Sequence, residues 1–80
     1  MDIDQAEHVH FVELAGEGAR ERLETQAARW HADGVRTTLL HSADDADLWL
    51  LVGRAATMPP PADVAGARTW RFAHAPEVRA

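Results

Sequence analysis

The chain has 80 residues, a formal net charge of −5 at pH 7 and no cysteine. This length allows one small domain, residues 1–80, whose core is marginal for its size, and the lack of cysteine excludes disulfides and thiolate metal sites. The negative charge and the scattered arginines exclude a basic surface that follows a phosphate backbone, so we expect no binding to nucleic acid.

The N-terminal residues do not have the pattern of a signal peptide, and the chain has no apolar run of membrane-spanning length. Residues 1–7 lack the basic and apolar regions of a signal peptide, and no run of about 18 apolar residues is present to cross a membrane. We therefore expect a soluble cytoplasmic protein that does not contact membranes. Residues 1–7 and 76–80 are expected to be flexible ends.

A first strand is predicted over residues 8–14, because this segment has the β-branched and aromatic content of a strand. A helix is predicted over residues 17–33. Its apolar positions recur at steps of four, four and three residues and so form one stripe on the helix: Ala19, Leu23, Ala27 and Trp30. Gly34 is expected to end the helix in the left-handed backbone conformation, in which many helices end with a glycine.

Three further strands are predicted in the second half of the chain. Residues 35–41 and 47–53 flank a turn rich in serine and aspartate, so we expect these strands to form an antiparallel hairpin. A proline-rich link over residues 57–63 is predicted to be extended, and a single helical turn within 61–66 is left open. The last strand, residues 68–74, alternates large apolar side chains with small or polar ones.

The strand predicted over residues 47–53 contains five apolar residues in a row, which indicates that both of its faces are covered. We assign Leu48, Leu50 and Val52 to the helix, because aliphatic side chains suit its narrow stripe of small residues. Trp49 and Leu51 then face a second subunit, since one helix covers only one side of a sheet.

The predicted order is β-α-β-β-(short link)-β, which is an α+β, ferredoxin-like plan with one main helix. A right-handed crossover through the helix makes the first two strands parallel and leaves room for the third strand between them. The link is long enough to return the chain along the sheet without a second helix, because about ten residues at roughly 3.1 Å each span some 30 Å. A plain meander of the last three strands is the alternative topology.

Several weak motifs together indicate a family. They are Gly18 and Leu23 near the helix start, Gly34 before the second strand, Asp45 and Asp47 before the apolar run 48–52, and Trp70-Arg71-Phe72 in the last strand. With these motifs, residues 8–74 resemble a shortened member of the dimeric α/β-barrel superfamily that includes the antibiotic-biosynthesis monooxygenase domains.

The resemblance implies a homodimer in which two sheets pack face to face, with a small-molecule pocket between each sheet and its helix. Enzymatic members use Asn, Trp, and Tyr or His around this pocket without a cofactor. The chain has neither Asn nor Tyr, so this set of residues does not transfer intact and enzymatic activity is left open.

Candidates for the pocket are His10, Trp49, Trp70 and Arg71. The alternatives are that the tryptophans fill the core or dimer interface and that Arg71 is a solvated charge.

The histidines offer a second kind of site. His8 and His10 lie on one face of the first strand, about 7 Å apart, so both could bind zinc or iron if a third ligand came from a neighbouring strand. His74, His41 or Glu13 are the candidates for that ligand. A pair of partly exposed histidines at a sheet edge is the alternative, which we favour, and we expect no metal and no cofactor.

Three functions follow in order of preference. The first is a dimeric α/β barrel that binds a small apolar or aromatic molecule, with or without oxygenase-like chemistry. The second is a non-catalytic module for dimerisation or interaction, and the third is a histidine metal-binding protein. The first two share one expectation, which is a homodimer.

Overall fold

The computed structural model describes residues 7–74 of the chain. Both predicted flexible ends lie outside these residues, apart from Glu7, which begins the first strand. The secondary structure consists of β1 (Glu7–Ala15), α1 (Ala19–Ala32), β2 (Arg36–His41), β3 (Leu48–Ala55) and β4 (Arg68–His74). The predicted helix and strands are all present, with ends shifted by two residues or fewer.

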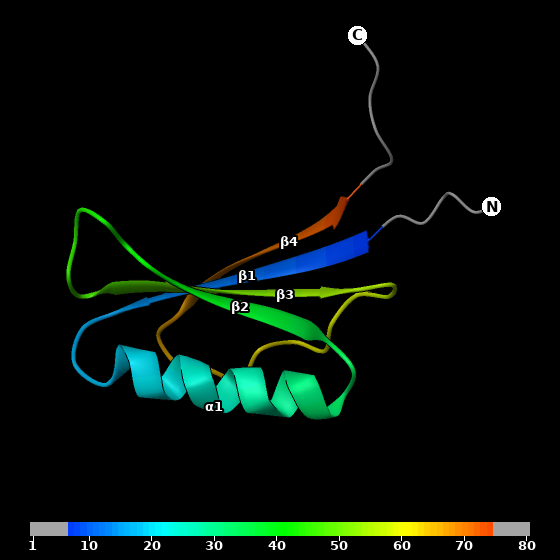
Figure 1. Cartoon of the computed structure of the whole chain (residues 1–80), viewed down its shortest axis with the longest axis horizontal. Helices are drawn as coiled ribbons and strands as arrows, with labels where there is room; N and C mark the ends of the chain where they lie inside the picture. Colours follow the sequence, from blue (N-terminus) through cyan, green and yellow to red (C-terminus); the bar gives the residue numbers. More distant parts are fainter. Residues whose placement is uncertain (1–6, 75–80) are drawn as a thin grey trace, which may run out of the picture.

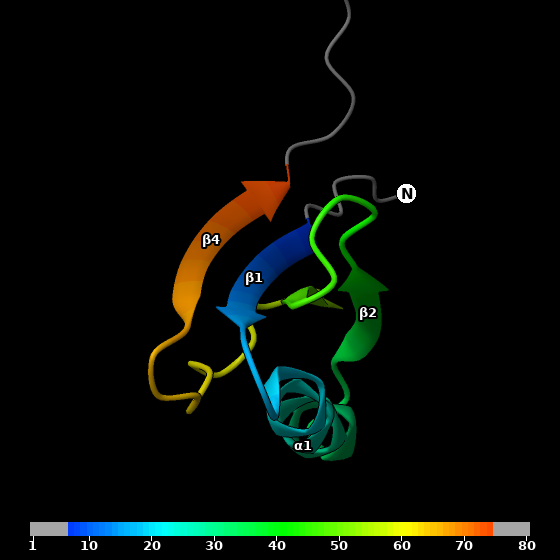
Figure 2. The same ribbon diagram turned by 90° about the vertical axis from the view of Figure 1, so that its left-hand side faces the viewer.

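The strands form one sheet with the order β2-β3-β1-β4, in which all neighbours are antiparallel. The helix and the link between β3 and β4 both lie on one side of this sheet, as Figures 1 and 2 show. β3 lies between β1 and β2, where the crossover argument leaves room for it, and β4 pairs with β1 rather than β3, which excludes the plain meander. The fold is α+β and compatible with a ferredoxin-like arrangement.

The helix begins and ends at glycines. Gly18 precedes the first turn with a φ of 80°, and Gly34 follows the last turn with a φ of 84°. Residues that have a Cβ rarely adopt this left-handed backbone conformation. The amides of Gly34 and Val35 donate to the carbonyls of His31 and Trp30, at 3.0 and 2.9 Å. The prediction that Gly34 ends the helix in this conformation is confirmed.

The core lies between the helix and the sheet. Val12, Leu23 and Leu51 are fully buried there, and Trp30 is 1% exposed. The indole of Trp30 lies directly on the backbone of β3, because a Cβ added at Gly53 would be only 2.5 Å from the Cζ3 atom of the ring. A glycine is therefore required at position 53 by the close approach of this one side chain.

The predicted facing of the third strand is wrong. Leu51 lies in the core with Leu23, and Trp49 is on the same side, where the Arg20 guanidinium of the helix lies 5.6 Å from its ring centre. Leu48, Leu50 and Val52 therefore point away from the helix. The physical reason is the size of Trp30, since only the face that carries Gly53 admits it, and strand alternation places Leu51 and Trp49 on that face.

The link between β3 and β4 is extended and takes the place of a second helix; the helical turn left open within 61–66 does not form. Its polar groups are held by side chains of α1. Trp30 donates its Nε1–H to the Pro60 carbonyl at 2.9 Å, and the Gln26 carbonyl accepts the Asp63 amide at 2.9 Å. Arg22 donates to the carbonyl of Ala65.

Gly53→Ala is expected to destabilise the protein by about 1–3 kcal/mol, because the new methyl group overlaps the Trp30 ring. Urea unfolding followed by circular dichroism measures this loss. In a Trp30→Leu background the same substitution is expected to have a much smaller effect, because the obstructing ring is gone. Equal effects in both backgrounds would contradict the proposed contact.

Candidate functional site

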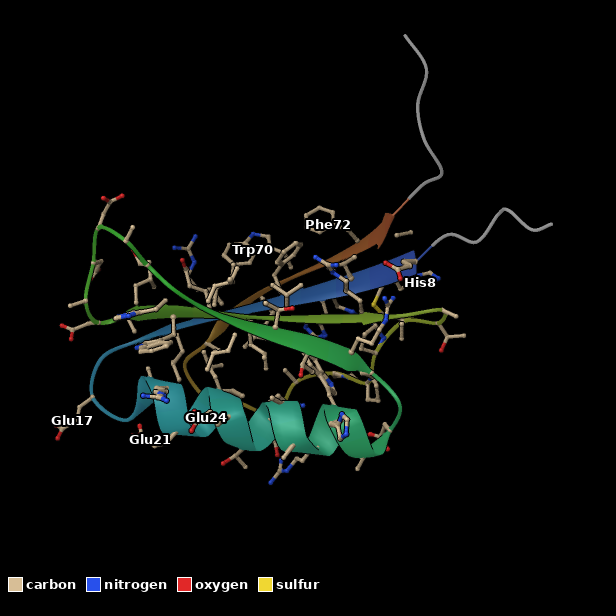
Figure 3. All side chains as sticks on the ribbon, in the orientation of Figure 1. His8, Glu17, Glu21, Glu24, Trp70 and Phe72 are labelled. Carbon is tan, nitrogen blue, oxygen red and sulfur yellow. The ribbon has the colours of Figure 1, made fainter. Side chains whose placement is uncertain are left out.

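One face of the sheet points away from the helix and the link, and no described element covers it. We call it the open face. Strand register and alternation assign to it Val9, Phe11, Glu13, Thr38, Leu40, Leu48, Leu50, Val52, Trp70 and Phe72, with Glu7, Arg36, Arg54 and Arg68 at its ends. Trp70 and Phe72 are seen to project from this side in Figure 3.

Large apolar side chains of the open face are exposed to solvent. Phe72 is 53% exposed, Leu40 48% and Trp70 37%, and these are the only large hydrophobic residues exposed to this extent among residues 7–74. Phe11 and Phe72 touch edge to face, with ring centres 5.8 Å apart. Monomeric proteins rarely leave a contiguous apolar surface of this kind in water, so the open face has the character of an association surface.

Two ion pairs border the apolar part of the open face. Arg36 pairs with Glu7 at one end. At the other end the Arg68 Nη1 atom lies 3.7 Å from the Glu13 Oε1 atom, and the Arg68 guanidinium lies over the Trp70 ring at 5.4 Å. The side chain of Glu13 is only 25% exposed, so its carboxylate lies within the face rather than beyond its rim.

On the helix side, His10 is the notable polar residue. It is 2% exposed, its ring centre lies 5.1 Å from that of Trp30, and neither ring nitrogen forms a hydrogen bond within the described residues. Burial lowers its pKa below the usual value, the Arg71 charge lowers it further, and the Pro60 carbonyl opposes both effects. The imidazole is therefore neutral at pH 7.

The four residues predicted to surround a ligand do not lie together. His10 and Arg71 are opposite each other on β1 and β4, on the helix side. Trp49 is on the same side but at the far end of β3, where it stacks on His41 with ring centres 3.9 Å apart. Trp70 lies on the open face. The structure thus brings His10 and Arg71 together and separates Trp70 from them.

Among the described residues, those proposed as metal ligands also do not come together at one site. His8 and His10 lie on the same side of β1, as predicted, and the backbone of His74 is paired with that of Glu7. Glu13 lies on the other face of β1 from His10. In the part of the chain that the structure describes, no group of three or more histidine, aspartate or glutamate side chains is arranged to hold a metal ion.

Two hollows lie at the end of the open face where β3 begins, and both are lined by Glu13 and Leu48. The smaller, about 190 Å³, also contacts Leu40, Trp49 and Leu50 and is mainly apolar. The larger, about 400 Å³, extends to the Glu13–Arg68 ion pair and the turn at Gly66. On the helix side of the sheet, another hollow of about 190 Å³ lies between α1 and the link, lined by Arg22, Thr25, Gln26, Arg29, Asp63 and Val64.

Sequence reasoning found part of the open face. The alternation of the last strand placed Trp70 and Phe72 on one side and Arg71 on the other, as the structure has them. It did not find Leu40 or Glu13 as members of the same surface. The two-residue period of a strand does place Glu13 on the same side of the first strand as Phe11, which is the signal that was available.

No family model, curated protein or solved structure matches the chain. Within residues 7–74, α1 is too short and too polar to cross a lipid bilayer.

The buried His10 predicts a dependence of stability on pH. Its folded pKa is below the unfolded value of about 6.5, so the stability it contributes is fully present above pH 6.5 and is lost as the pH falls below that value. Urea unfolding at pH 7.5, 6.5 and 5.5 is expected to show this loss in the wild type and a smaller loss in His10→Leu. His31→Leu, at an exposed position of α1, is the matched control, and it should retain the full dependence.

Proposed function

We propose that the protein is a non-catalytic association module that forms a homodimer through the open face of its sheet. The exposure of Leu40, Trp70 and Phe72 on this one face is the observation that carries the proposal. Two sheets packed face to face in this way correspond to the dimeric α/β barrel that the sequence resembles. The two faces would be about 10 Å apart, the usual spacing of stacked sheets.

The energetic case rests on a few large side chains. Fully burying an exposed leucine or phenylalanine side chain contributes about 1.5–3 kcal/mol. Leu40, Trp70 and Phe72 are about half exposed, so each contributes correspondingly less to association, and a homodimer buries each of them twice. Association itself opposes this by at least about 4 kcal/mol of lost translational and rotational freedom. A small domain with an incomplete core gains most from this burial, because it has few other ways to remove apolar surface from water.

Phe72→Asp is expected to raise the dissociation constant of the homodimer by at least about a hundredfold, because it removes a large apolar contact and places a charge in the interface. Sedimentation equilibrium between 1 and 200 µM, concentrations typical of the method, measures this constant. Ala73→Asp is the matched control, because Ala73 is exposed on the opposite face of the same strand.

Circular dichroism checks that both variants fold. A wild type that remains monomeric at the highest concentration would overturn the proposal, as would equal effects of the two substitutions.

A second candidate function is the binding of a small apolar or aromatic molecule. The mainly apolar hollow of about 190 Å³ on the open face favours it, because such pockets are lined chiefly by apolar side chains with a few polar groups beside them. It is lined by Leu40, Leu48 and Leu50, and it extends around the edge of the sheet to Trp49 and His41, which stack on each other on the helix side. This candidate retains only the ligand-binding part of the family resemblance, at a different place from the one expected.

Binding of 1-naphthol, a small aromatic probe, tests the second candidate. Its fluorescence is expected to change on titration with the wild type and to change at least about tenfold less with Leu48→Asp, since a charge in an apolar hollow opposes entry of the probe. Ala28→Asp, on the exposed side of α1, should bind as the wild type does. Unchanged fluorescence with the wild type at millimolar probe would remove this candidate.

A further inference from the structure

Glu13 has different neighbours on its two sides within the open face. Its backbone is paired with that of Arg68 on β4 and with that of Leu50 on β3. Leu50 is paired in turn with Leu40 on β2. Residues directly opposite each other in an antiparallel sheet point to the same side, so these four side chains form one row across the open face. The Glu13 carboxylate therefore has a guanidinium on one side and leucine side chains on the other.

The carboxylate of Glu13 has room for a further hydrogen-bond donor. Its side chain is three-quarters buried, and the Nη1 atom of Arg68 lies 3.7 Å from its Oε1 atom, which is beyond hydrogen-bond distance. Arg68 is itself 77% exposed and holds its guanidinium over the Trp70 ring. A charge that is withdrawn from water is unfavourable unless donors compensate it, so this carboxylate favours a ligand that brings an N–H group.

The apolar hollow of about 190 Å³ lies on the leucine side of Glu13. Its lining includes Glu13 together with Leu40, Leu48 and Leu50, but it does not include Arg68. Arg68 lines the larger hollow instead, with Gly66. A molecule in the smaller hollow thus contacts apolar side chains and the carboxylate at the same time, while the guanidinium lies on the far side of the carboxylate.

Charge and size select the class of molecule that fits this hollow. An anion is repelled by Glu13, and a wholly apolar molecule removes water from the carboxylate without replacing its hydrogen bonds. An organic ammonium ion donates to the carboxylate through charge-assisted hydrogen bonds, while its apolar part covers the leucines. A cavity of about 150 Å³ holds a benzene molecule, so the hollow has room for one ring with a short side chain.

We infer that the hollow beside Glu13 binds a small organic amine, with the ammonium group on the Glu13 carboxylate and the apolar part against Leu40, Leu48 and Leu50. This inference rests on the second candidate function, the binding of a small apolar or aromatic molecule. It adds the charge of the ligand and the residue that recognises that charge.

The amine site can be tested apart from the homodimer. Phe72 is paired with Val9, which lies four residues before Glu13 on β1, a distance of about 13 Å along the strand. The substitution Phe72→Asp therefore opposes association and leaves the hollow as it is. Binding of the amine is expected to be at least as tight in Phe72→Asp as in the wild type, because the site is complete within one chain.

Titration with 2-phenylethylamine at pH 7 tests the inference, followed by the NMR amide signals of Leu48 and Leu50. Saturable shifts are expected up to about 10 mM, a range suited to ligands with so few atoms. 2-Phenylethanol, which has a hydroxyl group in place of the ammonium, is expected to bind at least about tenfold more weakly. Glu13→Gln is expected to weaken binding of the amine at least about tenfold and to leave binding of the alcohol unchanged.

The matched control is Glu17→Gln, which removes the same charge at an exposed position beside α1, away from the open face (Figure 3). It should bind the amine as the wild type does, and Arg68→Gln should bind it at least as tightly, because a competing cation is gone.

Equal binding of amine and alcohol by the wild type would overturn the inference and leave the second candidate function intact. Equal effects of Glu13→Gln and Glu17→Gln would also overturn it, because they would assign the preference to net charge. A wild type that binds neither molecule would overturn both the inference and the second candidate.

Discussion

The contact between Trp30 and Gly53 decides which side of the sheet is inside. The indole needs a strand position without a Cβ, and Gly53 provides it on β3. Once this face of β3 meets the helix, alternation buries Leu51 and leaves Leu50 and Val52 to the other side. The same indole holds the link through the Pro60 carbonyl, so one side chain orients the central strand and fixes the segment that replaces a second helix.

The sequence was sufficient for the elements that have a strong local signal. The helix follows from the spacing of its apolar stripe and from Gly34, and the last strand follows from its alternation. The sequence alone did not predict which face of β3 meets the helix, because that strand is apolar on both sides. Its orientation depends on the size of Trp30, a residue 23 positions away from Gly53. The attachment of the link to Gln26 and Arg22 also depends on tertiary contacts that no local pattern shows.

In the candidate site, too, the residues with a strong local pattern were predicted and those set by tertiary contacts were not. Trp70 and Phe72 were placed on one side by their spacing alone, because a strand has a period of two. Glu13 was not recognised as part of that surface, because a lone glutamate in a strand is usually solvated. Its environment is set by β3 and β4, which meet β1 only in the folded sheet.

The two faces of the sheet differ in what their side chains contact. The helix side contains the closely packed core, and its one buried imidazole is neutral and surrounded by Trp30, Arg71 and the link. The open side contributes little to the core of a single chain but holds the exposed aromatic residues. Folding of a single chain and the association proposed for the open face therefore involve largely separate sets of side chains.

The central position of β1 has a consequence for synthesis on the ribosome. This strand is made first, yet its two neighbours are β3 and β4, and the last of these is complete only when His74 has been added. At about 5–20 residues per second, β1 waits several seconds for its full set of backbone partners. The nascent chain meanwhile carries an unpaired strand rich in apolar side chains, which is the type of segment that chaperones hold until the sheet closes.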